Sequence, residues 1–224
     1  MTTQIEEWRL IIESLDRNLS RAQYGIAIYS TSRDETGKVI KQIASKLNPS
    51  DEDYLNRLQI FNHLDLINQQ DAVLSICRMM DIDKRTRSFS KLASVAKNKE
   101  SCLINLAKSQ YLNADKDPVH KHLQNTLVAE QKEQIKAFIR LENTLRGSTH
   151  YKTIKLLRDK KLAHSSKELI TSKTSIDMAI KCLNDLEELL HLAYLIFLMT
   201  GYNTRTNFDY ASEDAKKFWE LFVS

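Results

Sequence analysis

Residues that interrupt helices are scarce in this chain, and their scarcity is the strongest constraint on its fold. Only four glycines and two prolines occur in 224 residues. A many-stranded sheet needs more turn residues, and the β-branched and aromatic runs typical of strands are missing. Apolar residues recur at spacings of three and four, as in Trp8, Ile11, Ile12 and Leu15. The sequence therefore predicts one all-α domain over residues 1–224, a helical bundle in which residues 1–50 form an N-terminal helical elaboration.

Caps and breakers divide the chain into expected helices. Gly37 predicts a break in the first helical segment, and Pro49 ends a helix. Ser50 and Asp53 form a capping box in its Asp variant, and Ser88 caps a short helix. The other expected helices are residues 4–30, 51–80, 118–146, 174–199 and 212–222, and one that begins at Ser148. The helix at 118–146 is expected to end at Gly147 as its C′ residue and to turn inward Leu123, Leu127, Ile135, Phe138, Leu141 and Leu145. Gly201 closes the helix at 174–199, and the last helix has Phe218, Trp219 and Phe222 available for docking.

Cysteine usage and hydropathy indicate where the protein works. Cys77, Cys102 and Cys182 lie in apolar helical patterns, and an odd number without framework spacing is typical of reduced thiols. The charged N-terminus is unlike a signal peptide. The most apolar run, residues 189–199, is too short to span a bilayer, and its His191 is expected to be a hydrogen-bonded core residue. We therefore expect a cytoplasmic protein that does not contact a membrane.

Positive charge is concentrated in two segments that lie far apart in the sequence. Residues 78–99 and residues 148–173 each contain seven Lys or Arg and two acids, although the whole chain carries a net charge of only +4. If the two segments meet in space, they form a patch suited to a polyanion such as RNA. Charge alone favours the other interpretation, which is two separate solvated helix faces.

The segment LLRDKKLAH, residues 156–164, is the candidate site, because it ends an apolar helical run with charged residues and a histidine. Arg158 and His164 would point about 120° apart on one regular helix. Either the helix ends or bends between them, or a second chain completes the site. The structural alternative is a capping role, because Lys and His interact favourably with the C-terminal end of a helix dipole. No histidine cluster or carboxylate pair elsewhere suggests a metal site.

The stretch LRDKKLAHSS resembles the Arg-x(4–6)-His motif of the HEPN superfamily of small α-helical proteins, with five residues between Arg158 and His164. A second stretch, LSICRMMDIDKRTRSFSKLAS at residues 74–94, resembles a segment of the abortive-infection U-type branch of that superfamily. Met79 and Phe89 stand where leucines are common in the branch. The matching positions in the second stretch are Arg78, Asp81, Lys84, Arg85 and Ser88.

This resemblance implies a HEPN-like bundle and a metal-independent endoribonuclease, either a toxin or an antiphage abortive-infection effector. It implies a homodimer in which two copies of the motif face each other in a cleft. His164 would exchange a proton with the ribose 2′-OH or the leaving 5′-oxygen, and Arg158 would stabilise the phosphate. The products would be a 2′,3′-cyclic phosphate and a 5′-hydroxyl. The alternatives are a HEPN-like module that binds RNA or protein without cutting it, and a purely structural dimerisation protein.

The resemblance also implies roles for single residues, and no cofactor or metal. Asp159 either orients Arg158 or His164 or is a surface acid, whereas Arg78 and Asp81 form an intrahelical ion pair by default. Ser166 stands where some HEPN toxins carry a tyrosine that a nucleotidyltransferase antitoxin modifies, so inhibition by that route is not expected. An antitoxin or another regulatory protein is still a candidate partner. The implied site residues are Arg158, His164 and Asp159 as catalytic, Lys155, Lys160 and Lys161 as RNA-binding, and Arg78, Asp81 and Arg85 as supporting or structural.

Overall fold

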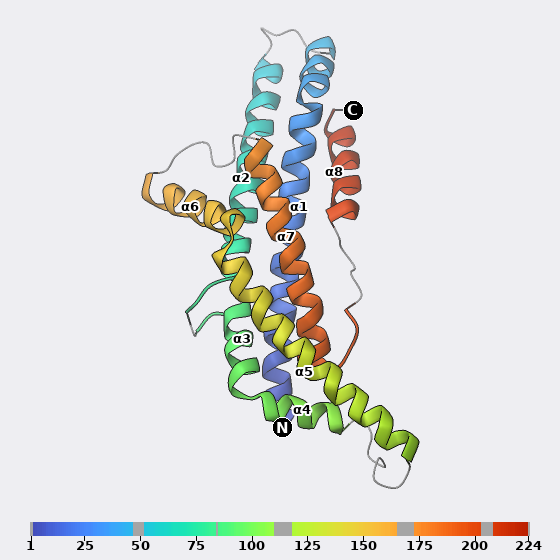
Figure 1. Ribbon diagram of the computed structural model, residues 1–224. Helices are drawn as coiled ribbons and strands as arrows, with labels where there is room; N and C mark the ends of the chain where they lie inside the picture. The colour runs from blue at the N-terminus through green and yellow to red at the C-terminus, as the bar shows by residue number, and fades with distance from the viewer. Residues whose placement is uncertain are drawn as a thin grey trace. The chain divides into compact units, whose positions relative to one another are not determined.

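The computed structural model describes residues 2–46, 52–83, 85–109, 118–164, 173–202 and 208–223, and this part of the chain is helical without a strand (Figure 1). The expected all-α fold is therefore confirmed. No helix in the described ranges combines the length and the apolar character needed to cross a membrane. The elements are α1 (Thr2–Lys46), α2 (Glu52–Met79), α3 (Phe89–Asn98), α4 (Glu100–Lys108), α5 (Pro118–Gly147), α6 (Thr149–His164), α7 (Lys173–Ala193), the π-helical turn η1 (Tyr194–Leu198) and α8 (Phe208–Val223).

The first helix is longer than the sequence predicts. α1 is continuous from Thr2 to Lys46, so the expected break at Gly37 is wrong. A single glycine inside a helix costs only about 1 kcal/mol relative to alanine, which is too little to interrupt a helix of this length. Pro49 and Ser50 of the expected cap lie outside the described residues, and α2 begins at Glu52.

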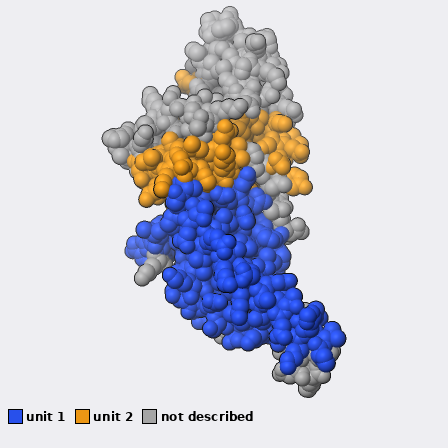
Figure 2. Space-filling view, in the orientation of Figure 1, with its two compact units in different colours: residues 1–17, 78–148, 184–203 blue, residues 18–77, 149–183, 204–224 orange. Residues whose placement is uncertain are grey.

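The chain divides into two compact units, each built from several separate segments (Figure 2). Unit 1 comprises Met1–Arg17, Arg78–Ser148 and Asn184–Asn203. Unit 2 comprises Asn18–Cys77, Thr149–Leu183 and Thr204–Ser224. The single-domain organisation over residues 1–224 stays a prediction, as does the meeting of the two basic segments.

The core of unit 1 contains a chain of aromatic rings from four elements. The ring of Trp8 in α1 packs edge-on against Phe197 in η1, with 5.4 Å between centroids. Phe197 also meets Phe138 of α5 at 6.1 Å, and Phe138 meets Phe89 of α3 at 6.3 Å. All four side chains are buried, so each gains its full apolar burial together with the favourable geometry of tilted rings.

The capping of α3 and the inward face of α5 largely follow the prediction. The Ser88 side chain accepts a hydrogen bond from the backbone N–H of Lys91 at 3.3 Å, which confirms Ser88 as an N-cap. Ile135, Phe138 and Leu145 are buried, and Leu127 and Leu141 are half-buried. Leu123 is 42% exposed, so its expected inward position is wrong. Every residue from 118 to 123 is exposed, because α5 begins before it reaches the core of its unit.

Two expected helix ends take a different form in the structure. α5 does end at Gly147, but neither this glycine nor any other in the described residues has the positive φ of a left-handed C′ residue. The helix that follows residue 173 widens into the π-helical turn η1 and is closed by Met199, with φ of 54°, and not by Gly201. A non-glycine residue in this conformation costs about 1 kcal/mol.

The π-helical turn directs polar groups to specific partners within unit 1. The buried side chain of Gln131 donates from Nε2 to the carbonyl of Ile196 at 2.9 Å. Beyond Met199, the Tyr202 hydroxyl donates to Oδ1 of Asp16 at 3.0 Å, and its ring lies 5.0 Å from that of Tyr194. Burial, followed by the nearby Asp16 carboxylate, raises the pKa of Tyr202 above its usual value.

His191 and the last helix also differ from expectation. His191 is exposed, so its assignment to the core is wrong; an apolar run in a helix still has an outer face. α8 begins at Phe208 instead of residue 212. The side chains of Trp219 and Phe222, which were expected to dock, lie outside the described part of the chain.

Unit 2 depends on a close approach between α1 and α2 at Gly25. A Cβ atom placed on Gly25 would lie 2.6 Å from the backbone carbonyl oxygen of Asn68 and 3.0 Å from Cβ of Ala72. On another side of α1, Ala27 packs with Ala211 and Ala215 of α8, and Tyr24 donates a hydrogen bond to Asp214 at 3.1 Å. Small residues therefore bring the helices of this unit close together.

We expect Gly25→Ala to lower the free energy of unfolding by about 2 kcal/mol, because the new methyl group forces the α2 backbone away. Urea denaturation followed by circular dichroism measures the change. Gly147→Ala is the matched control, since a Cβ there meets nothing within 4 Å. Equal stability of the two variants would contradict the close packing described at Gly25.

Candidate functional site

The segment with the Arg-to-His motif lies on α6. Tyr151 and Ile154 are buried and fix the inward face of this helix. Arg158 follows Ile154 by four positions and therefore lies on the same face, where its side chain is 27% exposed. Leu156 is 59% exposed and Lys155 is exposed, so the other side of α6 faces solvent in this chain.

Arg158 is held by its neighbour Asp159. Its Nε donates to Oδ1 of Asp159 at 2.9 Å, and its Nη2 donates to the same oxygen at 2.7 Å. Partial burial by itself lowers the pKa of Arg158, but the hydrogen bonds to Asp159 and the nearby Cys77 and Tyr151 outweigh it and raise the pKa. The guanidinium is therefore a fixed positive charge in a defined orientation.

The backbone of α6 is helical without interruption from Arg158 to His164, which is its last residue. Of the two geometric alternatives, a helix that ends or bends between the two motif residues is therefore wrong. Positions 158 and 164 lie about 120° apart around the helix axis. The side chains of Lys160, Lys161 and His164 lie outside the described part of the chain.

The second basic segment forms the connection between α2 and α3. Arg78 is exposed and does not form the expected ion pair with Asp81, which lies beyond the end of α2 at Met79. Asp81 accepts a hydrogen bond from the backbone N–H of Asp83 at 3.1 Å instead. Arg85 pairs with Asp83 at 2.7 Å, and this hydrogen bond lowers the pKa of Asp83.

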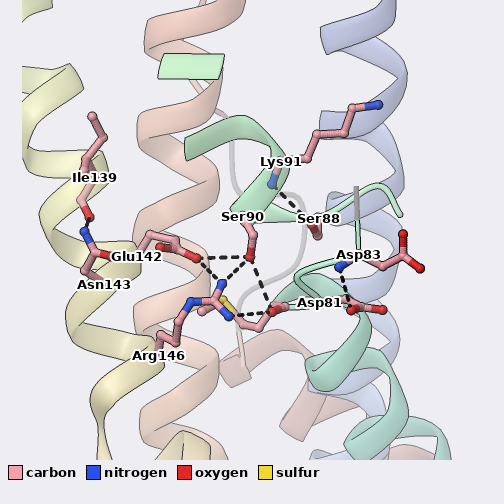
Figure 3. Close-up of polar contacts among 10 residues, drawn as sticks. Asp81, Asp83, Ser88, Ser90, Lys91, Ile139, Glu142, Asn143 and Arg146 are labelled. Atoms are coloured by element: carbon pink, nitrogen blue, oxygen red, sulfur yellow. Dashed lines mark hydrogen bonds and ion pairs between the residues drawn. The ribbon is translucent and has the colours of Figure 1, made fainter. Parts of the chain in front are cut away.

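A buried polar cluster centres on Arg146 near the end of α5 (Figure 3). The Arg146 guanidinium forms an ion pair with Glu142 and donates hydrogen bonds to Ser90 Oγ and, at 3.3 Å, to the carbonyl of Met80. Ser90 in turn donates to Glu142 at 3.1 Å and lies 3.4 Å from the Met80 carbonyl. Glu142 is only 4% exposed. The cluster connects the end of α5 to both ends of the α2–α3 connection.

Sequence reasoning missed this cluster, although one signal was present. Glu142 occupies a position in the apolar stripe that contains Ile135, Phe138 and Leu145, and an arginine follows four residues later. A carboxylate inside an apolar stripe with a cation at i+4 indicates a buried ion pair.

The cysteines and the other possible metal ligands of the described chain form no metal site. Cys77 and Cys182 are buried, Cys102 is half-buried, and none of the three forms a disulfide bond in the described chain. Within the described ranges, no three His, Cys, Asp or Glu side chains are grouped in a way that could hold a metal ion.

Comparison with known proteins extends these observations. The model of a HEPN family described as AbiU2 matches residues 5–218, which include both basic segments and the buried cluster. Neither a curated protein nor a solved structure matches the chain.

Proposed function

This chain belongs to the AbiU2 family of HEPN proteins, and from that premise we propose that it is a metal-independent endoribonuclease. It acts as a homodimer, either as a toxin or as an antiphage abortive-infection effector. The observation that carries the proposal is the Arg158–Asp159 pair on α6. A HEPN fold alone is compatible with binding as well as with cleavage, so the argument for cleavage comes from the chemistry of this motif.

Asp159 occupies one edge of the Arg158 guanidinium and leaves the rest available. Nε and one hydrogen of Nη2 point to Asp159, whereas both hydrogens of Nη1 and the second hydrogen of Nη2 remain. An arginine oriented in this way can donate two bonds to the oxygens of a phosphate that gains charge in the transition state. Lysine in its place would lack the planar fork.

His164 is the proton carrier in this proposal, because free imidazole titrates near pH 6.5 and can exchange a proton at neutral pH. The 2′-oxygen of the ribose attacks the adjacent phosphorus and passes its proton to an imidazole. The bond from phosphorus to the 5′-oxygen breaks, and that oxygen receives a proton from a second imidazole. A histidine from each copy of the motif would supply both transfers.

The dimer in this proposal is supported by the geometry of α6. Its unbroken helix separates positions 158 and 164 by about 120°, so a second copy brings a histidine toward the arginine more readily than the same helix does. Leu156, which is 59% exposed on the other side of α6, is an apolar side chain that a subunit contact would cover.

The test is cleavage of a short single-stranded RNA by the wild-type protein with EDTA present, beside the same oligonucleotide with 2′-deoxyribose at every position. The proposal predicts cleavage of the RNA only, with 2′,3′-cyclic phosphate ends identified by mass spectrometry. Cleavage of the deoxy substrate, or activity that EDTA abolishes, would exclude attack by the 2′-oxygen without a metal. Intact RNA that is still bound by the protein would favour the non-catalytic binding module.

A further inference from the structure

The α2–α3 connection carries exposed positive charge that lies outside the motif on α6. In the described chain this connection comprises residues 80–83 and 85–88. We call these residues together with Arg78 the arginine loop. Arg78 and Arg87 are exposed, the Arg85 side chain is 89% exposed, and Ile82 is 74% exposed. Three exposed arginines concentrate positive charge on this short connection, and Ile82 adds one exposed apolar side chain.

Hydrogen bonds within the arginine loop fix its backbone. Oδ1 of Asp81 accepts from the N–H of Asp83 at 3.1 Å, and Oδ1 of Asp83 accepts from the N–H of Arg85 at 2.9 Å. Thr86 donates to the Asp83 carbonyl from its backbone N–H at 2.9 Å and from its hydroxyl at 2.7 Å. These are successive turns stabilised by aspartate side chains. Because the loop is already ordered, a ligand that binds to it does not have to supply that ordering.

The buried cluster holds the arginine loop from beneath. Arg146 donates a hydrogen bond to the carbonyl of Met80, where the loop begins, and Ser90 Oγ lies 3.4 Å from the same carbonyl oxygen. At the other end, Ser88 caps α3 through the N–H of Lys91. The loop is therefore fixed at its start and at its end by α3 and α5, which belong to the same compact unit.

The acidic residues of the loop leave two arginines without a carboxylate. Asp83 is engaged by Arg85, and Asp81 by a backbone N–H. In the part of the chain that the structure describes, neither Arg78 nor Arg87 has an ion pair. Their guanidinium groups keep all their donors for a ligand, and the ligand that matches exposed guanidinium groups is a phosphate.

We propose that the arginine loop binds the phosphate backbone of RNA through Arg78 and Arg87, with Ile82 against the ribose or base of the nucleotide between them. The inference rests on the proposed function for the identity of the polyanion, and it adds a substrate-holding element apart from the cleaving motif. RNA fits better than an acidic protein surface, because phosphate contacts and one apolar contact are typical of single-stranded RNA recognition, and residues 78–99 are strongly basic.

The test measures binding of a fluorescein-labelled single-stranded RNA by anisotropy, in a His164→Ala background so that the probe stays intact. The Arg78→Ala/Arg87→Ala variant is compared with Arg9→Ala/Arg140→Ala, which removes the same charge from exposed positions on α1 and α5. We expect the loop variant to raise the Kd about tenfold at low salt and to reduce the slope of log K against log salt by about 1.4, since each lost phosphate contact removes about 0.7. The control should change the Kd less than twofold.

A charge-preserving variant and the oligomeric state separate the outcomes. Arg78→Lys/Arg87→Lys should recover part of the affinity and most of the salt slope, which a merely misfolded loop would not do. The inference would be overturned if the loop variant and the control had equal Kd values for RNA. It would also be overturned if the loop variant bound RNA like the wild type but had a changed dimer mass in sedimentation. If wild-type protein does not cleave RNA but the loop variant still loses affinity for it, the nuclease proposal fails and the loop assignment stands.

Discussion

His164→Ala is expected to lower the rate of RNA cleavage by about a thousandfold, because a positioned general acid or base typically contributes a factor between about 10² and 10⁴. Arg158→Ala should cause a loss of similar size, and Arg158→Lys should recover little, because lysine cannot keep both the hydrogen bonds to Asp159 and a fork toward the phosphate. Single-turnover rates on a labelled RNA measure the effect.

The control for the histidine is His63→Ala, which removes an exposed histidine from α2 and should leave the rate unchanged. If His164→Ala cleaves RNA at the wild-type rate, His164 is not in the site and the motif has been misassigned. Circular dichroism of each variant separates a loss of chemistry from a loss of fold.

Mixing the two inactive variants tests how the site is assembled. A mixed dimer of Arg158→Ala and His164→Ala chains contains one intact pair only if Arg158 of one protomer works with His164 of the other. The angle between the two positions on α6 favours that arrangement, so we expect the mixture to recover part of the wild-type activity, because it keeps one arginine and one of the two imidazoles that the proposed proton transfers use. A mixture as inactive as its components would indicate that each chain uses its own pair or that both histidines are required.

Glu142→Ala is expected to lower the free energy of unfolding by about 3 kcal/mol, because it leaves the Arg146 guanidinium partly buried without its carboxylate. Urea denaturation followed by circular dichroism measures the loss. Glu130→Ala, an exposed carboxylate on the same helix, should change the value by less than about 0.5 kcal/mol.

A double variant identifies the cause of that loss. Glu142→Leu/Arg146→Met removes both charges and keeps most of the volume, so it should be clearly more stable than Glu142→Ala. If Glu142→Ala is as stable as Glu130→Ala, the cluster contributes no net stability and α3 holds the loop without it. The rate of backbone amide hydrogen exchange at residues 80–83 and 85–88 should rise in Glu142→Ala and remain unchanged in Glu130→Ala.

The fold class could be predicted from the sequence because the signals for it are local. Spacings of three and four, the scarcity of glycine and proline, and the cap at Ser88 all act within a few residues, and the structure confirms them. The errors come from facts that are not local. Leu123 follows the helical pattern but precedes the point where α5 meets a partner, and His191 lies in an apolar run whose outer face is uncovered.

The candidate site could be predicted only in part, for the same reason. The sequence identified the α6 segment and left the role of Asp159 open, and the pairing of Asp159 with Arg158 depends on rotamers that spacing does not determine. The sequence also located the segment of the arginine loop, but the expected Arg78–Asp81 ion pair was wrong, because α2 ends at Met79, two residues before Asp81. The Arg146 cluster joins residues more than fifty positions apart, and no local pattern specifies such partners.

The π-helical turn η1 determines how this region tolerates insertions and deletions. Such a turn accommodates one residue more than an α-helical turn would, so the loss of a single residue from Tyr194–Leu198 could be absorbed by reversion to an ordinary helix. The residues beyond the turn would then keep their positions, so the Tyr202 hydroxyl would stay beside Asp16, whereas the carbonyl of Ile196 inside the turn would leave Gln131. Within this family, we therefore expect chains that lack one residue of η1 to keep the tyrosine and to lose the glutamine.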